Sequence, residues 1–246
     1  MDIFERNIYE QWEYISNVRK YGVVPLLDFG KLIDGNVSDK TIYRTVGKLA
    51  AAEVFSKIKI NTKERGVRYA IVLSEKFKTK YKITTRMDRF SHDLVLTSVV
   101  SNFKSIKGVV DIFMDAEWEK YVEEEGLNAT DIVPDAVLNL GSTTSFNESK
   151  VAIEVELARK NTKRIARKFQ KYAKGKDFSK VFYFIRDIDL WEVFCETLSS
   201  CAKSDPKYDY SRIVVVKILN PNKISADFNK LPTYSVLRKA ILCEEI

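Results

Sequence analysis

The sequence is poor in the residues that build several common metal and disulfide frameworks. Its single histidine, His92, leaves no histidine cluster to hold a metal, which excludes HNH and other histidine-based nuclease centres. The three cysteines, Cys195, Cys201 and Cys243, form no C-x-x-C pair and are odd in number. We therefore expect neither a zinc ribbon nor a disulfide framework, and a reduced, cytoplasmic protein.

Long apolar runs are also missing from the chain. The first residues lack the apolar stretch of a signal peptide. No run approaches the roughly eighteen apolar residues of a membrane span, so we expect no membrane partner. The 246 residues, of which 45% are hydrophobic, suffice for one large domain or two small ones.

Charge is plentiful but unevenly distributed. The net charge is +7, yet residues 86–158 carry 6 basic and 14 acidic side chains, and residues 159–180 carry 10 basic and 1 acidic. Residues 1–85 are basic again, with 16 basic and 10 acidic side chains. An acidic block between two basic ones favours a metal site framed by DNA-binding surfaces. The alternative is a plain acidic surface, which is our interpretation of the Glu123–Glu125 run.

Two short acidic motifs lie in runs that are typical of β-strands. Pro134-Asp135 is followed nineteen residues after the aspartate by Glu154-Val155-Glu156. The strand period of two puts Glu154 and Glu156 on one face, where like charges repel and packing alone explains them poorly. If Asp135 projects from the neighbouring strand, the three carboxylates predict a site for Mg²⁺ or Mn²⁺. The alternative is two exposed glutamates on a half-solvated strand.

A strongly basic segment follows the second acidic motif. Ile165, Phe169 and Tyr172 recur at helical spacing, which predicts a helix with one packed face and a cationic remainder. The exposed cations expected to contact phosphate are Lys163, Arg164 and Arg167. Acids that hold a metal, beside a basic helix that holds a phosphodiester, indicate a metal-dependent nuclease.

Residues 1–83 have the pattern of a winged helix-turn-helix domain. Helical periodicity covers 4–21, 24–32 and 38–49, and Ser38 is a good N-cap for the third helix. Strands are predicted over 54–60 and 67–73, with a basic turn between them as the wing. The expected DNA contacts are Lys40, Thr41, Arg44, Lys48, Lys63 and Arg65. The alternative is a winged helix used for protein contacts.

Residues 84–246 predict a second domain, a mixed sheet flanked by helices. A basic connector to residue 90 precedes a helix over 91–103. The expected strands lie near 108–114, 131–140, 150–157, 180–185 and 213–219, with the basic helix before the fourth and a helix over 190–202 before the fifth. The fold class is therefore α/β (α+β).

This order of elements, with its acidic motifs, resembles the PD-(D/E)xK nuclease superfamily. The Pro-Asp pair ending at Asp135 matches the PD, and the segment from Glu154 to Glu156 matches (D/E)xK, except that Glu156 replaces the usual lysine. The resemblance implies a restriction-endonuclease-like fold with Asp135 and Glu154 as metal ligands. It leaves Glu156 as a third ligand or a base, and Lys160 as a displaced catalytic cation.

The combination with the N-terminal domain looks like the replication-relaxation group and the MobC-type (MOBC) relaxases of mobilisable plasmids. That resemblance implies nicking of plasmid DNA at an origin of transfer, with accessory relaxosome and coupling proteins as partners. HUH relaxases are excluded, because they need several histidines. His92 and Asp93 could add to the site, although a helix cap or a satisfied polar group is the plainer role for His92. Tyr172 could order the site or simply pack in the core.

Two other functions remain open at the level of the sequence. One is a restriction- or transposon-type endonuclease that makes double-strand cuts with the same active site. The other is a non-catalytic plasmid replication or transcription regulator, in which a nuclease-like fold serves only to bind DNA. Such a regulator would gain by losing acids that face phosphates, and this chain has three.

Overall fold

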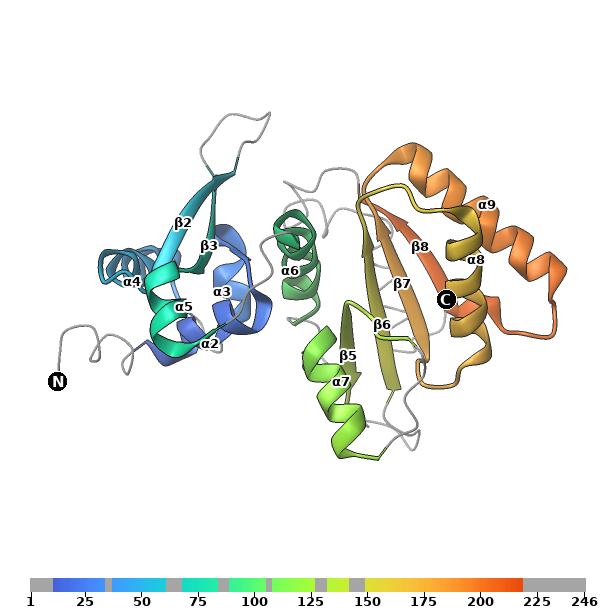
Figure 1. The fold of residues 1–246 in the computed structure, drawn as a ribbon, viewed down its shortest axis with the longest axis horizontal. Helices are drawn as coiled ribbons and strands as arrows, with labels where there is room; N and C mark the ends of the chain where they lie inside the picture. Colours follow the sequence, from blue (N-terminus) through green and yellow to red (C-terminus); the bar gives the residue numbers. More distant parts are fainter. Residues whose placement is uncertain are drawn as a thin grey trace. The chain divides into compact units, whose positions relative to one another are not determined.

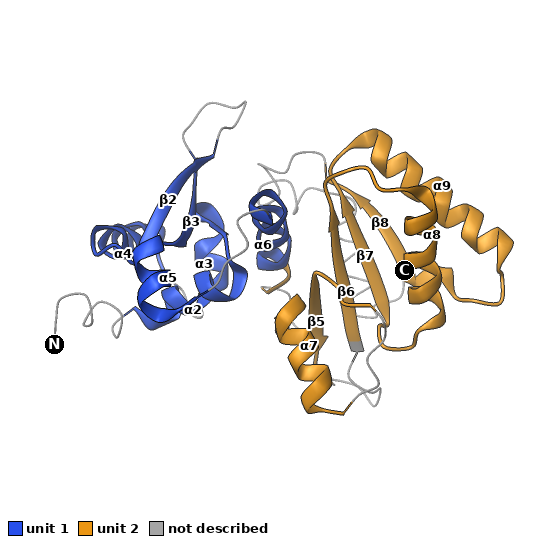
Figure 2. Cartoon of the chain, viewed as in Figure 1, with its two compact units in different colours: residues 1–102 blue, residues 103–246 orange. Residues whose placement is uncertain are grey.

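The computed structural model describes residues 11–33, 37–60, 68–83, 89–104, 108–126, 132–141 and 149–218. The chain forms two compact units, residues 1–102 and residues 103–246 (Figures 1 and 2). Helices and a mixed sheet confirm the predicted mixed α/β class. None of the described helices is long and apolar enough to cross a membrane.

The first unit combines helices with a three-stranded antiparallel sheet of order β1-β3-β2. In chain order its elements are α2 (Trp12–Tyr21), β1 (Val24–Pro25), the 3-10 helix η1 (Leu26–Asp28), α3 (Phe29–Leu32), α4 (Asp39–Ala51), β2 (Phe55–Ile60), β3 (Arg68–Leu73), α5 (Glu75–Tyr81) and α6 (Phe90–Lys104). The unit ends within the last turn of α6.

Helix α4 forms as the sequence predicts. The Ser38 hydroxyl accepts a hydrogen bond from the Thr41 backbone N–H at 3.3 Å, which caps the first turn. Ile42, Val46 and Leu49 are buried, and their helical spacing explains why one face of α4 packs while the other stays in solvent.

The predicted helix over 24–32 is wrong in its first half. Val24 precedes a proline, which disfavours helical backbone at that position, and it pairs with Ile71 of β3 instead. Gly22, with φ at 71°, ends α2 two residues earlier. The chain therefore makes the short strand β1 and a 3-10 turn before the single helical turn of α3.

Two helices replace segments for which the sequence predicted none. In α5, the Ser74 hydroxyl accepts from the Phe77 N–H and Phe77 is buried, within what was predicted as a connector. In α7 (Asp115–Glu124), which lies between the first two strands of the second unit, Trp118 and Val122 are buried one turn apart. Both helices are short, and their apolar residues are too few for a clear periodic signal.

Most of α6 belongs to the first unit, whereas the predicted domain boundary lies ahead of it at residues 83 and 84. Phe90 and Leu94 pack against the small apolar cluster on one face of the first sheet. The Ser98 hydroxyl donates to the buried carboxylate of Asp28 at 2.9 Å. These contacts account for the division of the two units inside α6.

The second unit is built on a five-stranded mixed sheet of order β4-β5-β6-β7-β8. Its elements after α6 are β4 (Val109–Met114), α7, β5 (Ala136–Leu140), β6 (Ser149–Glu156), α8 (Thr162–Lys174), β7 (Lys180–Ile185), α9 (Ile188–Ser204), the 3-10 helix η3 (Tyr210–Arg212) and β8 (Ile213–Lys217). Strands β4, β5 and β6 are antiparallel, and β6, β7 and β8 are parallel, so β6 lies where the sheet changes direction.

Helices α8 and α9 cover one face of this sheet (Figure 1). Phe169 of α8 and Phe194 of α9 meet edge to face, with ring centroids 5.8 Å apart, over Tyr183 of β7. On the opposite face, Phe182 and Phe184 contact Phe103 at the end of α6. Both faces of β6 and β7 are therefore buried, and any polar side chain on them needs a specific partner.

Candidate active site

Strands β5 and β6 bring Asp135 next to Glu154. The antiparallel register pairs Ala136 with Ile153, and one further step along it sets Asp135 opposite Glu154. The Val155 backbone N–H donates to Asp135 Oδ2 at 2.8 Å. Asp135 is thus fixed to the neighbouring strand just before β5 begins, which is the arrangement expected from the sequence.

Glu154 and Glu156 lie on the same face of β6, but they are not solvated. Their exposed fractions are 1% and 4%, so the alternative of two exposed glutamates is wrong. Two adjacent buried carboxylates are costly unless positive charge or hydrogen bonds accompany them. Helix α8 and the segment that leads into it supply both.

Glu154 is held by two residues of α8. Lys168 Nζ donates to Glu154 Oε2 at 2.6 Å, and the Tyr172 hydroxyl donates to Oε1. The two donors are four residues apart and therefore project from the same side of the helix. Lys168 was not among the predicted site residues, although it lies four residues before Tyr172, which belongs to the apolar stripe of the helix.

The environment changes the acidity of this cluster. Burial raises the pKa of the Glu154 carboxyl from 4.5 to about 7, while Lys168 lowers it and Asp135 raises it. Burial also raises the pKa of the Tyr172 hydroxyl well above its ordinary value, and the charge of Glu154 adds to that rise. Near neutral pH the Glu154 carboxyl can therefore gain or lose a proton, whereas the neighbouring Tyr172 hydroxyl stays protonated.

Glu156 has a separate partner. Lys160 Nζ donates to Glu156 Oε1 from the segment between β6 and α8. The side chain of Lys160 is 33% exposed and that of Glu156 is 5% exposed, so the ion pair links the buried cluster to the surface. The predicted displaced cation thus lies at the site, but against Glu156, while Lys168 takes the place beside Glu154.

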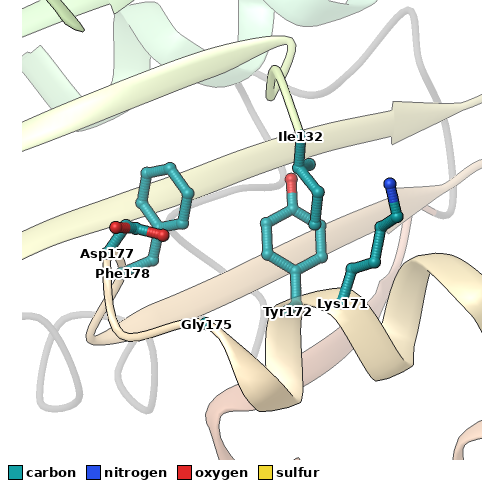
Figure 3. Close-up of a pocket in the computed structure, with 6 residues that line it drawn as sticks. All are labelled: Ile132, Lys171, Tyr172, Gly175, Asp177 and Phe178. Atoms are coloured by element: carbon teal, nitrogen blue, oxygen red, sulfur yellow. The ribbon is translucent and has the colours of Figure 1, made fainter. Parts of the chain in front are cut away.

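Tyr172 combines the two roles that the sequence left open. Its ring is buried and meets Phe178 and Tyr183 edge to face, at centroid distances of 5.9 and 6.1 Å. Its hydroxyl also bonds to Glu154. Figure 3 shows the ring standing out from α8 toward the strands, beside a cavity of about 10 Å³ that is lined by Ile132, Lys171, Tyr172, Gly175, Asp177 and Phe178. That volume is about the size of one water molecule and does not admit a substrate.

Arg212 holds the end of α8 that carries Tyr172. One terminal nitrogen donates to the carbonyl oxygens of Tyr172, Ala173 and Gly175 at 3.1, 2.9 and 2.7 Å. The other donates to the carbonyl oxygen of Phe178 at 3.1 Å. These bonds satisfy carbonyls that the helix end would leave without a partner. Arg212 was not predictable from the sequence, because the carbonyls that it binds lie over thirty positions away.

The predicted three-carboxylate metal site is not assembled. Within the described ranges, no group of three or more His, Cys, Asp or Glu side chains is arranged to hold a metal ion. Glu154 and Glu156 each face a lysine ammonium instead. Asp135 and Glu154 still offer two neighbouring carboxylates, and Mg²⁺ is commonly held by one or two carboxylates together with water and phosphate oxygens. The donor chemistry therefore fits a two-carboxylate site.

The cationic residues predicted to contact phosphate on α8 are on the outside of the helix. Lys163, Arg164 and Arg167 are all exposed, while Ile165 and Phe169 are buried. The helix therefore presents one face to the acidic cluster and the opposite face to solvent.

The predicted DNA contacts of the first unit are placed in part. Lys40, Arg44 and Lys48 are exposed on α4. Thr41 is half-buried and its hydroxyl lies 3.0 Å from that of Ser38, so it belongs to the helix cap. Lys63 and Arg65 lie outside the described residues. On β2, Lys57 and Lys59 are exposed as well, and the sequence analysis did not name them.

His92 and Asp93 lie in α6 of the first unit. His92 Nδ1 is 3.1 Å from Asp93 Oδ1 and 3.2 Å from a terminal nitrogen of Arg89. These contacts fit the plainer role of a satisfied polar group near the start of a helix.

Comparison with known proteins gives no relative for this arrangement. No protein-family model, curated protein or solved structure matches the chain. The chemistry of the site therefore follows from its own residues: a buried pair of carboxylates, two lysines, a hydrogen-bonded phenol and a cationic helix above them.

Proposed function

We propose that this protein is a metal-dependent DNA endonuclease that binds a specific plasmid site and nicks one strand there. The observation that carries the proposal is the juxtaposition of Asp135 and Glu154 beneath α8, whose outer face is cationic. Packing alone does not account for two neighbouring carboxylates on a buried sheet face. A phosphodiester would be attracted by the cations that α8 presents to solvent.

Mg²⁺ or Mn²⁺ would be held by Asp135 and Glu154. Bound there, the ion would supply stabilisation of the charge that builds on the scissile phosphate. Lys168 would keep positive charge beside Glu154, and the Tyr172 hydroxyl would fix the orientation of that carboxylate. The Glu156–Lys160 pair, which reaches the surface, would orient the approaching phosphate through its ammonium group.

The first unit would select the DNA site. Its helices and three-stranded sheet fit a winged helix, with α4 as the recognition helix and the β2–β3 hairpin as the wing. Lys40, Arg44 and Lys48 would face DNA from α4, because they are exposed there and the apolar side of the helix is buried. With DNA as its substrate, the protein would act in the cytoplasm.

The nuclease would be a PD-(D/E)xK-type relaxase that acts at an origin of transfer, in company with accessory relaxosome and coupling proteins. Among the tyrosines that the structure describes, Tyr172 and Tyr183 are next to the acids. Burial raises the pKa of both hydroxyls well above their ordinary value, which makes them poor nucleophiles. Hydrolysis is therefore favoured over attack by either of these tyrosines.

A second candidate is a non-catalytic DNA-binding regulator. The observation that favours it is that lysines already lie against Glu154 and Glu156, which neutralises the acids without a metal. Such a protein would bind its site equally well in EDTA and would leave the DNA intact.

Relaxation of supercoiled plasmid distinguishes these functions. The protein is incubated with plasmids that carry or lack candidate origins from its native replicon, in Mg²⁺, Mn²⁺ or EDTA. We expect a metal-dependent open-circular product that Asp135→Asn and Glu154→Gln abolish and that Glu196→Gln, at an exposed position, leaves unchanged. Linear product would favour a restriction- or transposon-type enzyme. Specific binding in EDTA without any cleavage would favour the regulator.

A further inference from the structure

The hydroxyl of Tyr183 is buried and has no role in the nuclease reaction proposed above. Tyr183 lies on β7 in register with Glu154 on the parallel neighbour β6, so both side chains project to the sheet face under α8. Its exposed fraction is 1%. Among the described residues, no group forms a hydrogen bond with the Tyr183 hydroxyl.

The ring of Tyr183 is fixed, which determines where the hydroxyl points. The ring of Phe169 stands edge to face with it, with ring centroids 5.1 Å apart, and the centroid of the Phe194 ring lies 5.7 Å away. Lys168 Nζ is 6.0 Å from the centroid of the Tyr183 ring. Burial raises the pKa of the Tyr183 hydroxyl, and the charges of Glu154, Glu156 and Asp135 add to that rise, in that order. The register with Glu154 places this side chain on the sheet face that carries the acids.

Packing does not explain a tyrosine at this position. Its ring packs against Phe169 and Phe194, and a phenylalanine ring would keep both contacts. A buried hydroxyl without a hydrogen bond carries a free-energy penalty that phenylalanine would avoid. A hydroxyl retained beside carboxylates is therefore expected to bind a polar partner.

We propose that Tyr183 is a positioning residue whose hydroxyl binds a water molecule against the Glu154 and Glu156 carboxylates. Water suits this place better than a phosphate oxygen, because a phosphate would be repelled by the acids. The phenol donates a hydrogen bond to the water, and the water donates hydrogen bonds to the carboxylate oxygens, so none of these groups needs to change its charge. The water would hold the two carboxylates in a fixed relation to one another. Its effect on cleavage rests on the proposed nuclease function; the water site itself does not.

The test compares Tyr183→Phe with Tyr210→Phe. Tyr210 is a matched control, since its hydroxyl is also buried without a hydrogen bond among the described residues, and the groups that act on it are Cys201, Asp205 and Tyr208 rather than the acids of the site. High-resolution crystal structures of the metal-free wild type are expected to show a water within about 3 Å of the Tyr183 hydroxyl. Structures of Tyr183→Phe are expected to show no water at that place. A wild-type structure without that water would overturn the proposal.

Cleavage gives the second readout. We expect Tyr183→Phe to fold normally and to nick plasmid about tenfold more slowly, which is the loss that one hydrogen bond accounts for. Tyr210→Phe should nick at the wild-type rate. Equal rates for wild type and Tyr183→Phe would overturn the positioning role. If the wild type does not cleave at all, the nuclease function fails, and the crystal structures alone decide whether Tyr183 binds the water.

Discussion

Glu154→Gln should remove a pH dependence of folding stability that a single buried carboxyl creates. Burial moves the pKa of Glu154 from 4.5 to about 7, so the folded protein keeps this proton over a range in which the unfolded chain has lost it. The contribution of protonated Glu154 to the free energy of unfolding is fully present below about pH 4.5 and is lost as the pH rises through 7. At about 1.4 kcal/mol per pKa unit, the loss is about 3 kcal/mol, most of it between pH 5 and 8.

The assay is urea unfolding followed by tryptophan fluorescence, to which Trp118, buried in the second unit, contributes. Glutamine cannot ionise, so the variant should not lose this stability as the pH rises. The difference in free energy of unfolding, variant minus wild type, should therefore be about 2 to 3 kcal/mol larger at pH 8 than at pH 5. Glu196→Gln, at an exposed position of α9, should run parallel to the wild type. A difference between Glu154→Gln and wild type that stays constant with pH would refute the reasoning.

Three further substitutions test the surroundings of the site. Lys168→Met leaves its carboxylate partner buried without an ammonium, and should lower the free energy of unfolding by about 2 kcal/mol at pH 8 in urea titrations; an unchanged midpoint would contradict this. Arg212→Ala removes four hydrogen bonds at the end of α8 and should lower the melting temperature, which Arg212→Lys should not restore, because an ammonium cannot reach all four carbonyls. Changing the exposed cations Lys163, Arg164 and Arg167 to glutamine should reduce the slope of log binding constant against log salt by about 2 to 3 in fluorescence-anisotropy titrations with DNA. An unchanged slope would place these residues outside the DNA interface.

The elements predictable from the sequence were those with a strong local signal. Helix α4 has a capping serine and an apolar stripe, and β6 has alternation that fixes the common face of Glu154 and Glu156. Helices α5 and α7 escaped prediction because each is held by one or two buried residues and a cap. At Val24, the proline that follows overrode the helical spacing of the apolar residues.

The partners within the site were less predictable than its acids. Which lysine reaches which glutamate depends on where α8 lies over the sheet, and several lysines of that segment fit the sequence equally well. Lys168 was missed for that reason, and nothing in the sequence indicated that Lys160 would pair with Glu156. Tyr183 could not be distinguished in the sequence from the apolar residues around it in β7, since only the register with β6 places it beside Glu154.

The change of strand direction at β6 has a consequence for the order of folding. The antiparallel strands β5 and β6 follow one another in the sequence, whereas pairing β6 with β7 needs the crossover through α8. Long-range pairing of this kind is slow to form, so Glu154 is expected to stay hydrated in the folding transition state and to be enclosed only after it. Its ionisation would then accelerate unfolding as the pH rises and leave the folding rate unchanged, which stopped-flow measurements at pH 5 and 8 would reveal. By this reasoning the proton on Glu154 governs how long the second unit stays folded, not how fast it folds.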